Sequence, residues 1–317
     1  MRRIILALTL ILMSSLVHAN ELIISTHNNA GGPYILSRII AKHIIKHLPS
    51  NYEVAIKTVP GAGGIVNANY IYNIAPRDGS VVGIVNSDVP LFSVMKNKNV
   101  QFEIDKFTWI GSAIDGRKEP YMFWIRKGST ELIAGTTTPG VFDYVDLINT
   151  IAKLNVRKVS GYSDANMIRM ALERNEVNSA THSYSGIKTN SKHWLNKDSD
   201  IIPILQWGNG SNKDPDFPNV KTLSEYITTD EDRMLLEFIE YSMILLRPYF
   251  APPNIPMDKA ALLQNAFMST LNDKDFLQDT AKSNIDISLV DHKTAQQIME
   301  KFVSLGRDPQ IQKYLNK

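Results

Sequence analysis

The chain has 317 residues, of which 44% are hydrophobic and 21% are charged. This is the composition of a globular protein, and it excludes a disordered, collagen-like or coiled-coil chain. The length predicts two domains, each able to bury a core of ordinary size. The chain contains no cysteine, which excludes a disulfide framework, thiolate metal ligands and a cysteine nucleophile.

The N-terminus has the pattern of a secretory signal peptide. Arg2 and Arg3 precede an apolar run at 4–12, and a small-residue site ends at Ala19. The run is shorter than the roughly 20 residues of a membrane-spanning helix. The chain has 34 basic and 32 acidic residues, so removing 1–19, with two basic residues, leaves 32 of each. We expect cleavage near Ala19, a location outside the cytoplasm and a neutral mature chain that does not bind nucleic acid.

The first hundred residues predict strands alternating with helices. We expect strands at 22–26, 54–59 and 80–85, with helices at about 34–48 and 65–74 between them. Pro33 suits the first turn of the first helix. This order predicts a parallel sheet, in which ligands bind outside the carboxyl ends of the strands.

The middle of the chain repeats this plan. The predicted strands are 121–126, 132–135, 156–159 and 201–207, the predicted helices are 143–154 and 165–174, and a short segment at 179–181 enters a polar loop at 182–186. The last part predicts a strand at 243–250 and two helices, 258–271 and 291–305, capped by Asp258 and Asp291. No flexible linker separates the halves, so we expect the chain to cross between two domains more than once.

Small-residue loops follow several of these strands. Gly61–Gly64 lies between a strand and a helix, and Ala30–Gly32 has the same placement. Main-chain N–H groups at a helix N-terminus are unpaired donors, and glycine lets a ligand approach them, so the loops favour a carboxylate or a phosphate. The alternative is that they are only tight turns. Nucleotide motifs are excluded, because Ile65–Asn67 replaces the Gly-Lys-Ser/Thr of a P-loop and Asn67 replaces the third glycine of a dinucleotide fingerprint.

Catalytic and metal-binding patterns are weak. No Gly-x-Ser-x-Gly elbow is present, and His182 beside Ser183 is more typical of binding than of catalysis. His43 and His47 are spaced like metal ligands but lack the intervening glutamate of a zincin, so we expect no metal and no cofactor. Trp124, Trp194 and Trp207 are expected to pack in the core.

A set of motifs resembles one family along essentially the whole mature chain. Val59–Gly64 followed by Asn69–Gly79 is similar to the signature of the substrate-binding proteins of tripartite tricarboxylate transporters, the Bug proteins. Further similar segments follow in order: Ala30–Gly32 with Arg38, Phe102–Phe107, Gly161-Tyr162, Ala171–Val177, Pro218–Thr222 and Arg247–Pro253. Family members usually carry an aspartate before the arginine that matches Arg38, whereas Pro33–Ser37 contains no acid. Pro33 also removes one N–H donor from this loop.

The resemblance implies an α/β, two-lobed periplasmic binding protein fold of type II, whose cleft closes on a ligand between the lobes. We expect lobe 1 at 20–118 plus 242–317 and lobe 2 at 119–241. The implied function is to capture a small organic carboxylate and deliver it to the membrane permease subunits of a tripartite transporter, as a monomer without enzymatic activity. Carried over by position, the implied ligand-binding residues are Asn28, Gly31, Gly32, Tyr34, Gly61, Ala62, Gly63, Asn86, Ser87, Thr136, Thr138, Tyr162 and Ser183.

Two alternatives remain open from the sequence. The same fold could serve as a receptor that presents its closed form to a sensor kinase. A secreted enzyme using His182 and Ser183 would instead convert a bound ester or amide.

Overall fold

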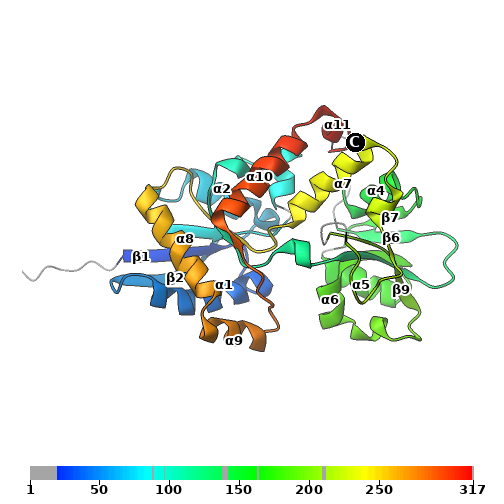
Figure 1. The fold of residues 1–317 in the computed structure, drawn as a ribbon, viewed down its shortest axis with the longest axis horizontal. Coiled ribbons are helices and arrows are strands. Elements are labelled where there is room, and N and C mark those ends of the chain that lie inside the picture. The colour runs from blue at the N-terminus through cyan, green and yellow to red at the C-terminus, as the bar shows by residue number, and fades with distance from the viewer. Residues whose placement is uncertain are drawn as a thin grey trace, which may run out of the picture.

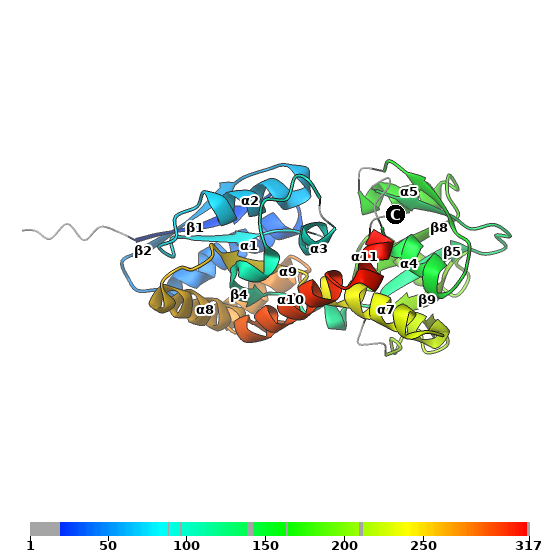
Figure 2. The same cartoon turned by 90° about the horizontal axis from the view of Figure 1, so that it is seen from above.

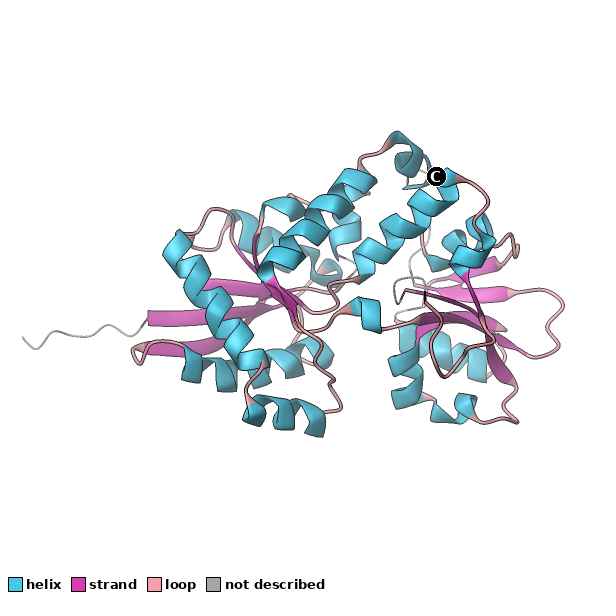
Figure 3. Ribbon diagram, in the orientation of Figure 1, coloured by secondary structure: helices cyan, strands magenta, loops and turns pink. Residues whose placement is uncertain are grey.

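The chain forms two lobes, each built on a mixed six-stranded sheet with helices on both faces (Figures 1 and 3). The computed structural model describes residues 20–87, 89–95, 97–137, 142–162, 164–208 and 212–315. The predicted signal peptide at 1–19 lies outside them. Within the described residues, no helix is long and apolar enough to span a membrane.

The sheet of lobe 1 has the strand order β12-β4-β11-β3-β1-β2. As predicted, the first three strands are parallel neighbours, with β1 between β2 and β3. Strand β11, from near the end of the chain, runs antiparallel between β3 and β4. The strands are β1 Asn20–Thr26, β2 Tyr52–Thr58, β3 Val81–Ile84, β4 Thr108–Ser112, β11 Pro248–Ala251 and β12 Val290–Asp291.

The sheet of lobe 2 repeats this pattern with the order β10-β9-β5-β8-β6-β7. Here β6 is parallel to β7 and β8, and β5 runs antiparallel between β8 and β9. The strand plan predicted to recur in the middle of the chain is therefore confirmed. The strands are β5 Tyr121–Arg126, β6 Ile133–Thr136, β7 Arg157–Ser160, β8 Ser179–Ser183, β9 Ile201–Trp207 and β10 Lys221–Thr222.

Helices bury both faces of each sheet. In lobe 1 a core of aliphatic and aromatic side chains packs under α1 (Gly32–Ile44), α8 (Met257–Leu271) and α9 (Lys274–Lys282). The opposite face carries α2 (Ile65–Asn73) and α10 (His292–Gly306), and this core continues through α7 (Asp230–Met243) and α4 (Tyr144–Ile151) into lobe 2. A third core lies under α5 (Ala165–Glu173) and α6 (Tyr184–Asn190). Two short helices are α3 (Val89–Val94) and α11 (Pro309–Leu315). Trp124, Trp194 and Trp207 are buried, as predicted.

Two chain segments connect the lobes and lie side by side, and Figure 2 shows the lobes apart on either side of them. The N–H of Ala113 donates to the carbonyl of Arg247, and the N–H of Leu246 donates to that of Ile114. The N–H of Gly116 also donates to the carbonyl of Ile244. These bonds tie the outgoing and returning segments together, so the lobes share one double-stranded hinge. The boundaries at 118/119 and 241/242 stay a prediction.

Three predicted elements differ from the structure. The apolar segment at 243–250 was predicted to be a strand, but α7 extends to Met243 and only Pro248–Ala251 forms β11. Asp258 does not cap α8, because the helix begins one residue earlier, after Pro256. The loop predicted at 182–186 is absent, since β8 continues to Ser183 and α6 begins at the next residue, Tyr184. Asp291 caps α10 as predicted.

Candidate functional site

Three loops of lobe 1 meet at the carboxyl ends of β1, β2 and β3, which are neighbours in the sheet. Two contacts show how close they are: the N–H of Val59 donates to the carbonyl of Thr26, and Nδ2 of Asn86 lies 3.5 Å from the carbonyl oxygen of Gly63. The structure thereby gathers nine of the predicted residues at one edge of lobe 1: Asn28, Gly31, Gly32, Tyr34, Gly61, Ala62, Gly63, Asn86 and Ser87.

The buried side-chain amide of Asn67 holds two of these loops in place through hydrogen bonds to the strand ends. Asn67 on α2 is fully buried, and its Oδ1 accepts a 2.6 Å hydrogen bond from Oγ of Ser25. Its Nδ2 donates to the carbonyls of Ser25 and Ile84, at 3.2 and 3.0 Å. One side chain therefore ties α2 to the ends of both β1 and β3, where two of the loops begin.

The helices that follow these loops have no side-chain cap. Gly31 at the start of α1 and Gly64 at the start of α2 have φ of 82° and 109°, and no side chain accepts from the first helical N–H groups. The second loop has positive φ at four successive residues, Gly61–Gly64, of which only Ala62 has a side chain. Glycine adopts this conformation without strain, whereas Ala62 at φ 45° is strained, as is common at ligand sites. At the start of α2 the N–H groups of Gly64 and Ile65 donate to the carbonyls of Gly61 and Ala62, so the partly positive surface open to an anion is formed chiefly by the start of α1.

The corresponding loops of lobe 2 are different, because acidic or hydroxyl side chains cap each helix. Asp143 accepts from the first turn of α4, Asp164 accepts from that of α5, and Ser183 accepts from the N–H of Gly186 in α6. Their N-terminal amides are therefore already used. Burial and the neighbouring Asp146 raise the pKa of the Asp143 carboxyl. Oγ1 of Thr136 lies 3.0 Å from Oγ of Ser160.

A chamber of about 420 Å³ lies between α3 of lobe 1 and the strand ends of lobe 2. Two predicted residues, Thr136 and Ser183, line it. Its aromatic wall was not predicted and is formed by Phe92, Tyr121, Phe142 and Tyr144. The size and mixed lining suit a small molecule with an apolar body.

The other predicted residues do not line the chamber. Tyr162 turns its ring to Gly135 on β6, within 3.0 Å of where a Cβ on that glycine would lie, and joins the core of lobe 2. Thr138 lies outside the described residues. The nine residues of lobe 1 form a separate group at their own loops. The predicted residues therefore lie in two half-sites, one at the lobe 1 loops and one in the lobe 2 chamber, which the structure holds apart.

Sequence reasoning missed Arg247, which lies where the two half-sites approach each other. Its Nη2 is 3.5 Å from the position of a Cβ on Gly32, and its charge interacts with Glu119 and Tyr121 of lobe 2. His27 was also missed: it is 94% buried, Nε2 has no hydrogen-bond partner, and Nδ1 lies 3.4 Å from the carbonyl oxygen of Ile84. Burial, with a smaller contribution from the charge of Arg247, lowers the pKa of the His27 imidazole. Arg247 is 215 residues from Gly32 in sequence, and only the strand order brings the two together.

His182 and Ser183 are not arranged as a base and a nucleophile. They are successive residues of β8, so their side chains point to opposite faces of the sheet. The His182 ring packs against Trp194 at 5.9 Å between centroids, and burial lowers its pKa to about 4. The Ser183 hydroxyl caps α6.

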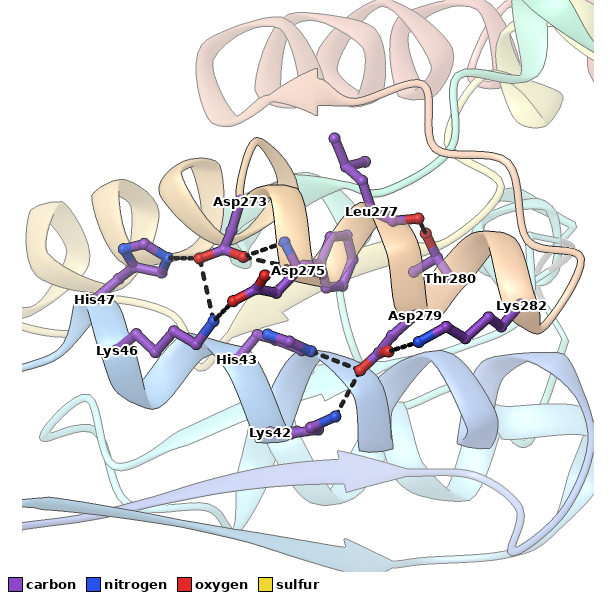
Figure 4. Close-up of polar contacts among 11 residues, drawn as sticks. Lys42, His43, Lys46, His47, Asp273, Asp275, Leu277, Asp279, Thr280 and Lys282 are labelled. Carbon is purple, nitrogen blue, oxygen red and sulfur yellow. Dashed lines mark hydrogen bonds and ion pairs between the residues drawn. The ribbon is translucent and has the colours of Figure 1, made fainter.

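His43 on α1 and His47 in the following 3-10 turn lie against aspartates of the α9 segment (Figure 4). Nε2 of His43 lies 3.0 Å from Oδ2 of Asp279, and Nε2 of His47 lies 3.4 Å from Oδ2 of Asp273, joining α1 to α9. Lys42 binds the same oxygen of Asp279 at 2.6 Å. Within the described residues, no group of three His, Asp or Glu side chains could hold a metal.

Several solved structures share this fold. A TctC solute-binding protein from Polaromonas has a TM-score of 0.65 and 14% identity, over 90% of this chain and 96% of that chain. MatC from Rhodopseudomonas palustris with bound malate has a TM-score of 0.62 and 15% identity, over 93% and 98%. The R. palustris protein Rpa4515 with adipate has a TM-score of 0.61 and 14% identity, over 93% and 97%.

No family model matches the chain, and neither does any curated protein. The strand order, the double hinge and the structural neighbours agree with one another. The chain has the two-lobed α/β fold of the TctC and Bug solute-binding proteins.

Proposed function

We propose that this chain is a periplasmic solute-binding protein of the Bug type, which captures a small organic carboxylate and delivers it to the membrane permease subunits of a tripartite transporter. The observation that carries the proposal is the set of glycine loops in lobe 1, where α1 and α2 begin without a side-chain cap and offer a partly positive surface to an anion. The similar structures with malate and adipate support a carboxylate as the ligand class.

Binding requires no covalent step. The solute first meets the exposed glycine loops, and rotation about the double hinge then brings the two half-sites together. Closure excludes water, which strengthens the hydrogen bonds to the ligand in the less polar interior. The closed form is the one that the permease recognises, and release of the unchanged solute follows its opening.

A thermal-shift screen of organic acids with the mature chain tests the ligand class. A ligand at 100 times its dissociation constant is expected to stabilise the protein by about 2.7 kcal/mol. Stabilisation by a sugar or a cation, with none by any carboxylate, would refute the proposal. Chromatography of the released ligand must return it unchanged, since a hydrolysed product would instead identify an enzyme.

Gly63→Val tests the loop, with Gly128→Val as its matched control. Both glycines have positive φ, 63° and 79°, and neither has an atom within 4 Å of an added Cβ, so backbone strain is similar. Gly128 lies in the turn after β5, outside the chamber lining. Only Gly63→Val should abolish binding in calorimetry. Equal loss in both variants would place the effect in the fold, not the loop.

A further inference from the structure

We propose that Arg247 anchors a single carboxylate of the solute and that the aromatic chamber receives an apolar body, so that the preferred ligand is a monocarboxylate with a ring-sized hydrophobic group. This inference rests on the proposed function and narrows it from carboxylates in general to one class.

The position of Arg247 is fixed by its backbone, while its guanidinium keeps free donors. Its N–H donates to Oγ of Ser112 at 3.2 Å, and its carbonyl accepts from Ala113 in the hinge. Nη1 donates to the carbonyl of Leu246 at 2.7 Å, and within the described residues the guanidinium has no ion-pair partner. Nη2 faces the backbone of Gly32, at the uncapped start of α1.

The surroundings of Arg247 favour an anion. Burial lowers the pKa of its guanidinium, which means that the charge is partly removed from water. Glu119, the nearest acid of lobe 2, accepts from the N–H of Ser185 at 2.9 Å and makes no direct contact with Arg247. A carboxylate placed against Gly32 would complete the cluster with charge-assisted hydrogen bonds.

Two charged side chains that line the chamber form ion pairs, although Nε of Arg169 is buried without a hydrogen-bond partner among the described residues. Asp143 lies 3.4 Å from Nζ of Lys158, and Arg169 binds Glu173 at 3.0 Å. The acidic caps of α4 and α5 also place negative charge at the helix ends of lobe 2. A second carboxylate would therefore meet the negative charge of these acidic caps, whereas an apolar group would not.

Tyr121 joins the anchor to the chamber. Tyr121 lies within electrostatic range of Arg247, and its ring lines the chamber, 5.2 Å from that of Tyr144 between centroids. Phe92 and Leu91 of α3 approach from lobe 1 and would cover the solute from the other side. A molecule with its carboxylate at Arg247 would thus direct its body along Tyr121 into the aromatic wall.

Isothermal titration calorimetry of the mature chain with phenylacetate and with succinate tests this inference. We expect phenylacetate to bind at least tenfold more tightly. Arg247→Gln should weaken phenylacetate binding by about 10- to 100-fold, the usual effect of losing a charged hydrogen-bond partner, and Arg247→Lys should weaken it less. Arg77→Gln, which removes the same charge at an exposed site after α2, should change the affinity by less than twofold.

The outcomes separate this inference from the proposed function. Tighter binding of succinate than of phenylacetate refutes the monocarboxylate class but leaves the carboxylate-binding function intact. Weakening by less than threefold in Arg247→Gln refutes the anchor. If Arg247→Gln does not fold, two other measurements test the anchor. The wild-type affinity for phenylacetate must fall as the salt concentration rises, and Arg247→Lys must retain part of the wild-type affinity. Failure of either result refutes the anchor. Binding of neither acid, nor of any other carboxylate, refutes both.

Discussion

Replacing Asn67 by leucine should destabilise lobe 1 and loosen two of its loops. The change keeps the side-chain volume but removes three hydrogen bonds, to Oγ and the carbonyl of Ser25 and to the carbonyl of Ile84. Each contributes a net 0.5–1.5 kcal/mol, and the site is fully buried, so water cannot replace the lost partner. We expect the free energy of unfolding to fall by about 2–4 kcal/mol.

Urea unfolding followed by circular dichroism measures this loss, with Asn73→Leu as the control. Asn73 lies on the same helix, but its bonds to Gln101 and Asn69 are exposed to water, so its replacement should change the free energy of unfolding by less than about 1 kcal/mol. Because Asn67 fixes the ends of β1 and β3, its variant should also bind solute more weakly. Equal stability losses in the two variants would refute the reasoning.

Three further predictions concern ionisable groups. Burial and Glu237 raise the pKa of Glu240 to about 7, so the free energy of unfolding should fall as the pH rises from about 4 to 7. In urea unfolding, Glu240→Gln should be more stable than wild type by up to about 3 kcal/mol at pH 8 but by little at pH 4. A difference that does not depend on pH would contradict this prediction. Because the pKa of His182 is lowered to about 4, its imidazole NMR signals should stay constant from pH 8 to 5. The free energy of unfolding should fall as the pH drops from about 6.5 to 4. Titration of the imidazole signals near pH 6.5 would be inconsistent with a buried ring. Lys42, His43 and Lys282 lower the pKa of Asp279, so Asp279→Asn should lower the melting temperature at pH 7. The difference should shrink below about pH 4, where the carboxyl of the unfolded chain begins to protonate while that of the folded protein stays ionised. No effect at pH 7 would show that the ion pairs do not stabilise the fold.

Local patterns predicted most of the strands and helices around the site. Apolar runs bounded by glycine placed β1, β2 and β3, and Pro33 marked the first turn of α1. The segment at 243–250 failed because a short apolar run does not distinguish the buried end of a helix from a strand.

The candidate site was only half predictable. The glycine loops of lobe 1 are local features, and the sequence located them. The joining of Gly32 to Arg247 depends on β11 entering the sheet beside β3, which no local pattern encodes. The capping of α4 and α5 by Asp143 and Asp164 was visible in the sequence as acids before helices, but its consequence for anion binding emerged only when both lobes could be compared.

The strand order of lobe 1 also constrains how the newly made polypeptide acquires its structure. Strand β4 has only β11 and β12 as sheet neighbours, and both are synthesised more than 130 residues later. Lobe 2, whose six strands form one uninterrupted stretch, can complete its sheet while β4 still lacks both partners. Late closure of such distant pairs is slow, so lobe 1 should be the last part to gain protection from hydrogen exchange during refolding.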